Sequence, residues 1–183
     1  VLARPLILRA APNHRPIVRL AAPLRFRPLV VGPQNHGLKV LLERMYFTPG
    51  TGFVATDALI ARAAVHSLEL KQTTLDPGGE QLLDPKLLDT DQLGAAHSAF
   101  HLRSDFGFGA NVAFAETPAI RLWRSVTGAI FVDQRAYTLD LQSSIVDGAG
   151  GAFALSAATG APDQTFGAET TVDCVTFFGR VRA

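Results

Sequence analysis

Two histidines and an aspartate at intervals of four residues are the first residues that suggest chemistry. His97, His101 and Asp105 would share one face of a helix and could present two imidazoles and a carboxylate to a metal ion. The segment that begins at Phe100, however, has the composition of a strand, in which residues four apart are separated by roughly 13 Å, too far for one ion. Ser98 also occupies the position where a zinc-dependent hydrolase carries glutamate. We therefore predict no metal site.

No candidate nucleophile lies in a sequence motif that is typical of covalent catalysis. Ser98, His66 and Asp57 could be drawn as a triad, but only geometry identifies a triad. Neither a nucleophile-elbow motif nor a phosphate-binding loop motif occurs. Cys174 lies in an apolar run and is expected to be a buried small side chain. We predict that the protein is not an enzyme and holds no cofactor.

Three aspartates and the single tryptophan are weaker indications of a functional site. Asp133, Asp140 and Asp147 recur every seven residues, which would suit calcium or a pair of glycosidase carboxylates. Their positions at strand ends and turns favour a structural role instead, since aspartate is a common turn residue. Trp123 is expected either as a core residue or as the anchor of an interface.

The charges of the chain are distributed unevenly. The first 42 residues contain seven Lys and Arg and no acid, whereas residues 43–183 contain ten basic and sixteen acidic side chains. A segment of formal charge +7 therefore precedes one of formal charge −6, in a chain whose net charge is +1. Residues 76–91 hold five acids and one lysine and are the natural counterpart of the basic segment. Complementary potentials of this kind set partner choice and register.

The basic segment is also rich in proline. Six of the eleven prolines fall within the first 33 residues, which excludes a sustained helix and predicts extended structure. Apolar clusters at 6–8, 17–20 and 29–31 lie between the prolines and would bind a protein surface. We predict that residues 1–37 form an extended arm that clamps a neighbouring subunit. The residues expected to make subunit contacts are Arg4, Arg9, Arg15, Arg19, Arg25, Phe26, Arg27, Asp84, Asp89 and Asp91.

Two other interpretations of residues 1–37 stay open. The segment could be an ordinary strand region with a chance deficit of acids. It could also bind nucleic acid, but Phe26 is the only aromatic residue among the arginines, and single-stranded nucleic-acid sites interleave several. The prolines and arginines that break up its apolar clusters predict no signal peptide, and no window is long and apolar enough to predict a membrane span.

The rest of the chain has mainly strand patterns. Apolar and polar residues alternate in 119–127 and 129–141, and residues 170–181 are rich in β-branched and aromatic side chains. Residues 58–66, after Asp57, predict a short helix. No internal repeat of twenty to fifty residues is evident.

These patterns predict a mainly β fold, a β-sandwich or barrel-like domain over residues 38–183 with one or two short helices. An acidic loop near 76–93 and a loop rich in Gly and Ala at 148–168 would project from it.

Composition and organisation together predict a structural role. We expect a non-enzymatic subunit of virion type, such as a capsid, decoration or tail component of a virus or phage. Its partners would be other copies of itself and other structural proteins, with nucleic acid less favoured and no membrane. The alternatives are a carbohydrate- or ligand-binding β-sandwich and an accessory subunit of a large cellular complex.

Overall fold

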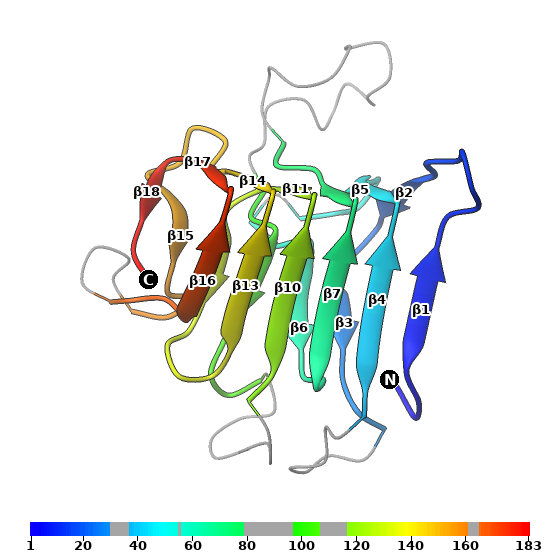
Figure 1. The fold of residues 1–183 in the computed structure, drawn as a ribbon, viewed down its shortest axis with the longest axis horizontal. Helices are drawn as coiled ribbons and strands as arrows, with labels where there is room; N and C mark the ends of the chain where they lie inside the picture. Colours follow the sequence, from blue (N-terminus) through cyan, green and yellow to red (C-terminus); the bar gives the residue numbers. More distant parts are fainter. Residues whose placement is uncertain (30–36, 55, 79–96, 107–116, 161–164) are drawn as a thin grey trace.

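The chain forms a parallel β-helix. A computed structural model describes residues 1–29, 37–54, 56–78, 97–106, 117–160 and 165–183, and within these ranges all regular secondary structure is strand (Figure 1). The described chain winds through six turns, here called rungs, and each rung gives one strand to each of three six-stranded sheets. Each rung stacks on its neighbours through parallel ladders, which makes the fold a solenoid.

The three sheets take their strands in chain order. The first sheet contains β1 (Leu6–Arg9), β4 (Lys39–Glu43), β7 (Ser67–Lys71), β10 (Ala119–Trp123), β13 (Thr138–Gln142) and β16 (Glu169–Asp173). The second sheet contains β2 (Ile17–Leu20), β5 (Tyr46–Pro49), β8 (Thr74–Leu75), β11 (Val126–Thr127), β14 (Ile145–Asp147) and β17 (Thr176–Phe178). The third sheet contains β3 (Leu24–Phe26), β6 (Ile60–Ala63), β9 (Phe100–Leu102), β12 (Ile130–Val132), β15 (Phe153–Ser156) and β18 (Arg180–Val181).

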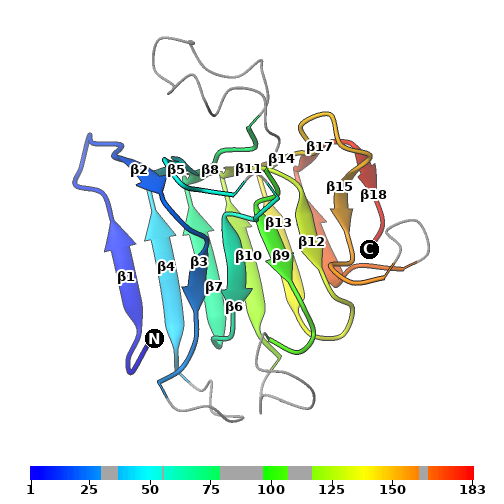
Figure 2. The same cartoon turned by 180° about the vertical axis from the view of Figure 1, so that it is seen from behind.

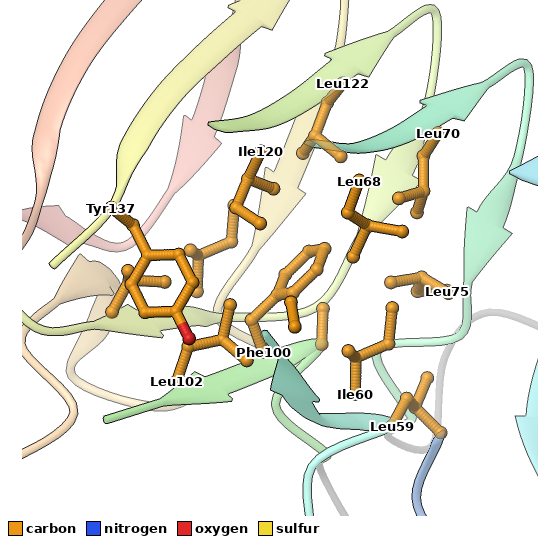
Figure 3. Close-up of a cluster of buried hydrophobic side chains, with 14 of the residues drawn as sticks. Leu59, Ile60, Leu68, Leu70, Leu75, Phe100, Leu102, Ile120, Leu122 and Tyr137 are labelled. Carbon is orange, nitrogen blue, oxygen red and sulfur yellow. The ribbon is translucent and has the colours of Figure 1, made fainter. Parts of the chain in front are cut away.

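Alternation of apolar and polar residues builds the first sheet. In β10, Ile120 and Leu122 are buried whereas Arg121 is exposed, because neighbouring side chains of a strand point to opposite faces. The parallel register stacks equivalent positions of successive strands on one another, so the inward positions form two continuous rows, apolar except at Thr170. The two rows are Leu6, Val40, Leu68, Ile120, Leu139, Thr170 and Leu8, Leu42, Leu70, Leu122, Leu141, Val172. These rows form one wall of the hydrophobic core, part of which Figure 3 shows.

The corner between the first and second sheets has the same backbone conformation in five rungs. The residue after each first-sheet strand has a positive φ, which costs a non-glycine residue about 1 kcal/mol or more. These residues are Arg44 (58°), Gln72 (51°), Arg124 (49°), Ser143 (48°) and Cys174 (53°). Their recurrence in register shows that stacking of the rungs imposes the bend.

A ladder of hydroxyl groups runs along the inside of this corner. The Oγ of Ser125 accepts a hydrogen bond from the N–H of Thr73 at 3.3 Å, and the Oγ of Ser144 accepts one from the N–H of Ser125 at 3.1 Å. Thr73 donates its hydroxyl proton towards the carbonyl of Leu42, 3.0 Å away, in the preceding rung. The ladder therefore joins four rungs and satisfies amides that the bend removes from the strand pattern.

The expected β-sandwich with an arm is wrong. Residues 6–9, 17–20 and 24–26 form β1, β2 and β3, so the proline-rich segment is the first rung and not an extension. The predicted helix at 58–66 contains β6 instead, because its apolar residues face a core that stacking rungs provide. Residues 148–168, expected as a loop, contain β15. The acidic residues 79–93 lie outside the described part of the chain.

Candidate functional site

In the described part of the chain, the first sheet has an edge strand at each end of the β-helix. In Figure 1 the six strands of the first sheet lie side by side and point the same way, with β1 at one edge and β16 at the other. Within the described chain β1 pairs only with β4, and β16 pairs only with β13, so each has a free backbone edge. Leu8 and Val172, which end the same inward row, are 39% and 51% exposed. Each end thus presents a cross-section of the core together with unpaired strand edges.

Most of the arginines predicted as subunit contacts lie in or beside the first rung. Arg9 ends β1, where its Nε donates to Oε2 of Glu43 at 2.6 Å, and Arg15 donates to the hydroxyl of Thr74 at 3.3 Å. Arg19 lies in β2 and Arg25 in β3.

The remaining predicted contact residues divide into three groups. Arg4 precedes β1 and is exposed, and Arg27 follows β3. Phe26 is buried in the core and is not available to a partner. Asp84, Asp89 and Asp91 lie outside the described residues.

The outer face of the first sheet carries a hollow of about 320 Å³. Its polar lining comes from three neighbouring strands, with Glu69 and Lys71 on β7, Arg121 on β10, and Asp140 and Gln142 on β13. Glu69 pairs with Lys71 at 3.2 Å and with Arg121 at 3.4 Å, so the charges nearly balance.

Trp123 completes the lining of this hollow. Its side chain points outward from β10, is 37% exposed, and carries the guanidinium of Arg124 at 4.7 Å from the ring centroid. It is therefore not the core residue that one interpretation of the sequence expected.

The three residues considered for a metal site are not arranged as one. His97 is buried against Phe53, with ring centroids 5.4 Å apart, whereas His101 points outward from β9. Asp105 pairs with Arg103 at 3.3 Å. Across the described ranges, no group of three or more His, Cys, Asp or Glu side chains could hold a metal ion.

The other chemical candidates have structural surroundings. His66 precedes β7 of the first sheet and Ser98 precedes β9 of the third, so the elements that carry them belong to different walls. The carboxylate of Asp133 accepts hydrogen bonds from the amides of Ser104, Ala158 and Thr159, and Asp147 accepts one from the amide of Ala149. Asp147 thus fixes a local turn, whereas Asp133 joins the segments that follow β9 and β15 of the third sheet.

Cys174 is exposed at the corner of the last rung and is not the buried side chain expected from the sequence. Its thiol lies 3.3 Å from a carboxylate oxygen of Asp173. This hydrogen bond and the negative charge of Asp173 raise the pKa of the thiol, which disfavours the thiolate.

Comparison with protein families, with curated proteins and with solved structures found no match to this chain. The described residues also contain no helix that could span a membrane. The function must therefore be argued from the geometry of the β-helix itself.

The stacking of rungs into three parallel sheets is the feature that the sequence analysis did not predict. The signal was present as pairs of apolar residues two positions apart, such as Leu68 and Leu70 or Leu139 and Leu141, followed by a polar residue at the corner. The first-sheet strands begin at residues 6, 39, 67, 119, 138 and 169, so the interval varies from 19 to 52 residues. A search for a fixed period could not find it.

Proposed function

We propose that this protein is a non-enzymatic structural subunit, of the kind found in virion fibres and tails, that assembles through the ends of its β-helix. The observation that supports the proposal most directly is the sixth rung, whose inward-facing Val172 is half exposed although its equivalents in inner rungs are buried. An uncovered apolar end favours a partner that covers it.

Head-to-tail stacking of two copies would continue the sheets. Because β1 and β16 point the same way, a second copy shifted along the helix axis would add its β1 to β16 as one more parallel pair. In that register the inward rows also continue, since Val172 would meet Leu8 and Phe177 would meet Val18 of the next copy. A contact between two different surfaces of the same molecule does not close on itself and builds a filament.

Charge supports this direction of stacking. One outward-facing row of the first sheet begins at Arg9 in β1 and ends at Asp173 in β16. Stacking in register would therefore place Asp173 of one copy and Arg9 of the next on neighbouring strands. Arg9 already makes such a pair with Glu43 within the chain. Strand β16 contains two acids and no base, whereas β1 carries Arg9 and follows Arg4. Stacking of two first rungs would instead bring arginines together.

The third sheet does not share this complementarity, because stacking in the same register would place Arg182 beside Arg25 of the next copy. Arg180 and Arg182 lie near the last edge, and each stacks on an aromatic ring, with guanidinium-to-centroid distances of 4.5 Å to Phe153 and 5.2 Å to Phe166. The charge complementarity is therefore confined to the first sheet.

Charge reversal tests the proposal. Asp173→Arg and Arg9→Glu should each lower self-association by about tenfold or more, because each places like charges on neighbouring strands. The double variant should recover association, since the pair is restored with opposite polarity. Ala119→Arg is the matched control, because it adds a charge to the outer face of the same sheet in an inner rung, between Ser67 and Thr138. Equal association of all four variants would refute the proposal.

A saccharide-binding role is a second candidate, favoured by the hollow beside Trp123. An aromatic ring together with carboxylate, amide and guanidinium groups suits a neutral, hydroxyl-rich ligand, since the local charges nearly balance. Trp123 is the only tryptophan, so its fluorescence reports on this hollow alone. A saturable fluorescence change on titration with neutral oligosaccharides, absent in Asp140→Ala, would establish this role. An unchanged spectrum would exclude it.

A further inference from the structure

The outer face of the third sheet carries a second hollow, also of about 320 Å³. Figure 2 shows the strands that form its floor, β3, β6 and β9, side by side. Its lining includes three arginines, Arg25, Arg62 and Arg103, together with His101 and a single carboxylate, that of Asp57. The lining side chains therefore carry more positive than negative charge, although Arg103 also pairs with Asp105, at 3.3 Å.

The arginines are closer together than their charges favour. Arg25 and Arg62 are register partners on β3 and β6, and neighbouring strands lie roughly 4.8 Å apart. Like charges directly opposite each other destabilise a sheet. Burial lowers the pKa of Arg62, the charges of Arg25 and Arg27 lower it further, and the charge of Asp105 acts in the opposite direction. A bound anion beside Arg25 and Arg62 would weaken the repulsion between their charges.

A buried hydroxyl group also lines this hollow. Tyr137 is only 1% exposed, and its ring packs on Phe106 with centroids 5.2 Å apart. In Figure 3 it lies at the border of the cluster of buried side chains, close to Leu102 of β9. Its hydroxyl has no hydrogen-bond partner among the described residues. Buried polar groups without a partner are rare in folded proteins, which points to a ligand that accepts from this hydroxyl.

The hydroxyl of Tyr137 acts as a donor. Burial raises the pKa of the phenol, and the charges of Asp133 and Asp105 raise it further, so the group stays protonated at neutral pH. The ligand must therefore supply an acceptor oxygen, and the surrounding guanidinium groups favour a negative one.

We propose that this hollow binds a phosphate group, held by the guanidinium groups of Arg25, Arg62 and Arg103 and by the hydroxyl of Tyr137. Guanidinium groups bind tetrahedral oxyanions through two parallel hydrogen bonds, and four oxygens can serve three arginines and a phenol together. The volume of the hollow exceeds that of one oxyanion, so a phosphate monoester fits as well as free phosphate. This proposal is independent of the association of the ends.

Calorimetric titration with inorganic phosphate and with glycerol 3-phosphate, at low ionic strength, tests the proposal. Both probes should bind the unmodified protein. Tyr137→Phe removes only the hydroxyl and should weaken binding about tenfold, and Arg62→Gln should weaken it by tenfold or more. Lys39→Gln, on the outer face of the first sheet and outside both hollows, removes one positive charge elsewhere and should leave binding unchanged.

Thermal unfolding provides a second readout that does not depend on the folding of the arginine variant. Because the hydroxyl of Tyr137 has no partner among the described residues, Tyr137→Phe without phosphate should be at least as stable as the unmodified protein. Its melting temperature should nevertheless rise less on addition of phosphate.

The two probes separate the sources of the phosphate group. Binding of inorganic phosphate alone would identify the free ion, and binding of both would identify a monoester. Absence of binding by both probes, or equal binding by the unmodified protein, Tyr137→Phe and Arg62→Gln, would overturn the proposal.

Discussion

Val172 lies beside Leu141 in the same inward row of the first sheet, yet Leu141 is fully buried and Val172 is 51% exposed. The two residues have equivalent positions in consecutive rungs, and the difference arises because no further described rung covers Val172. Full burial of a valine side chain contributes about 1.5 kcal/mol, and Phe177, partly buried in the same rung, would add to it. The sixth rung therefore presents apolar area that a further rung would bury, which is the basis of the proposed association.

The hydroxyl ladder at the corner should contribute measurably to stability. Ser125→Ala removes the acceptor of the buried amide of Thr73, so we expect the free energy of unfolding to fall by about 1–3 kcal/mol. Urea denaturation measures this change. Ser143→Ala, in the exposed corner position next to the ladder residue Ser144, is the control and should have little effect. Equal losses in the two variants would show that the ladder does not stabilise the corner.

Gly128 should tolerate no side chain. A Cβ at this position would lie 2.4 Å from the carbonyl oxygen of His97, so Gly128→Ala forces the backbone of two rungs apart. We expect a loss of about 3 kcal/mol or more in the free energy of unfolding. In Gly150→Ala the new Cβ would contact no other atom. The only cost is the positive φ of 80°, which should lower the free energy of unfolding by about 1 kcal/mol. The reverse order of the two losses would contradict the close packing at Gly128.

Cys174 should react slowly with thiol reagents although it is exposed. Asp173 raises the pKa of the thiol, because its carboxylate hydrogen-bonds the protonated form and repels the thiolate. Asp173→Asn should therefore increase the rate of alkylation at pH 8, and the rates of the two proteins should converge at higher pH. Cys174 is the only cysteine, so the rate reports on this site alone. Equal rates at pH 8 would show that Asp173 has no influence on the thiol.

Tyr137 should make the protein sensitive to alkali. Burial raises the pKa of its phenol, so above about pH 10 the group ionises in the unfolded chain but not in the folded one. The stabilising contribution is present below that pH, and the free energy of unfolding should fall by about 1.4 kcal/mol per pH unit above it. Tyr137→Phe should show a slope that is smaller by this amount. Urea denaturation between pH 9 and about pH 11.5 measures both slopes, and identical slopes would contradict this account.

The strands could be predicted from the sequence, but their arrangement could not. Alternation in 119–123 correctly predicts a strand with Ile120 and Leu122 inside, and the β-branched residues of 170–181 correctly predict strands at the end. The alternation of apolar and polar residues shows which face of a strand is buried, but the same alternation occurs in β-sandwiches and in β-solenoids. The irregular interval between rungs concealed the repeat that distinguishes the two.

The basic first segment illustrates how tertiary context overrides local composition. Its prolines correctly predict extended structure, but the three strands there pair with β4, β5 and β6 and do not reach outward. The predicted helix after Asp57 is wrong for a related reason, since Ile60 and Ala63 are buried at both ends of β6. Neither the hydroxyl of Tyr137 nor the arginines around it could be brought together from the sequence, because they come from four separate rungs.

The central claim is that the open ends of the β-helix associate, and sedimentation velocity over a concentration series tests it most directly. We predict species whose masses are multiples of the 19.5 kDa chain and whose fraction grows with protein concentration. Val172→Asp should reduce the fraction of these species. Thr171→Asp, which faces outward, should reduce it far less. A single 19.5 kDa species at every concentration, for the unmodified protein as for Val172→Asp, would contradict this claim.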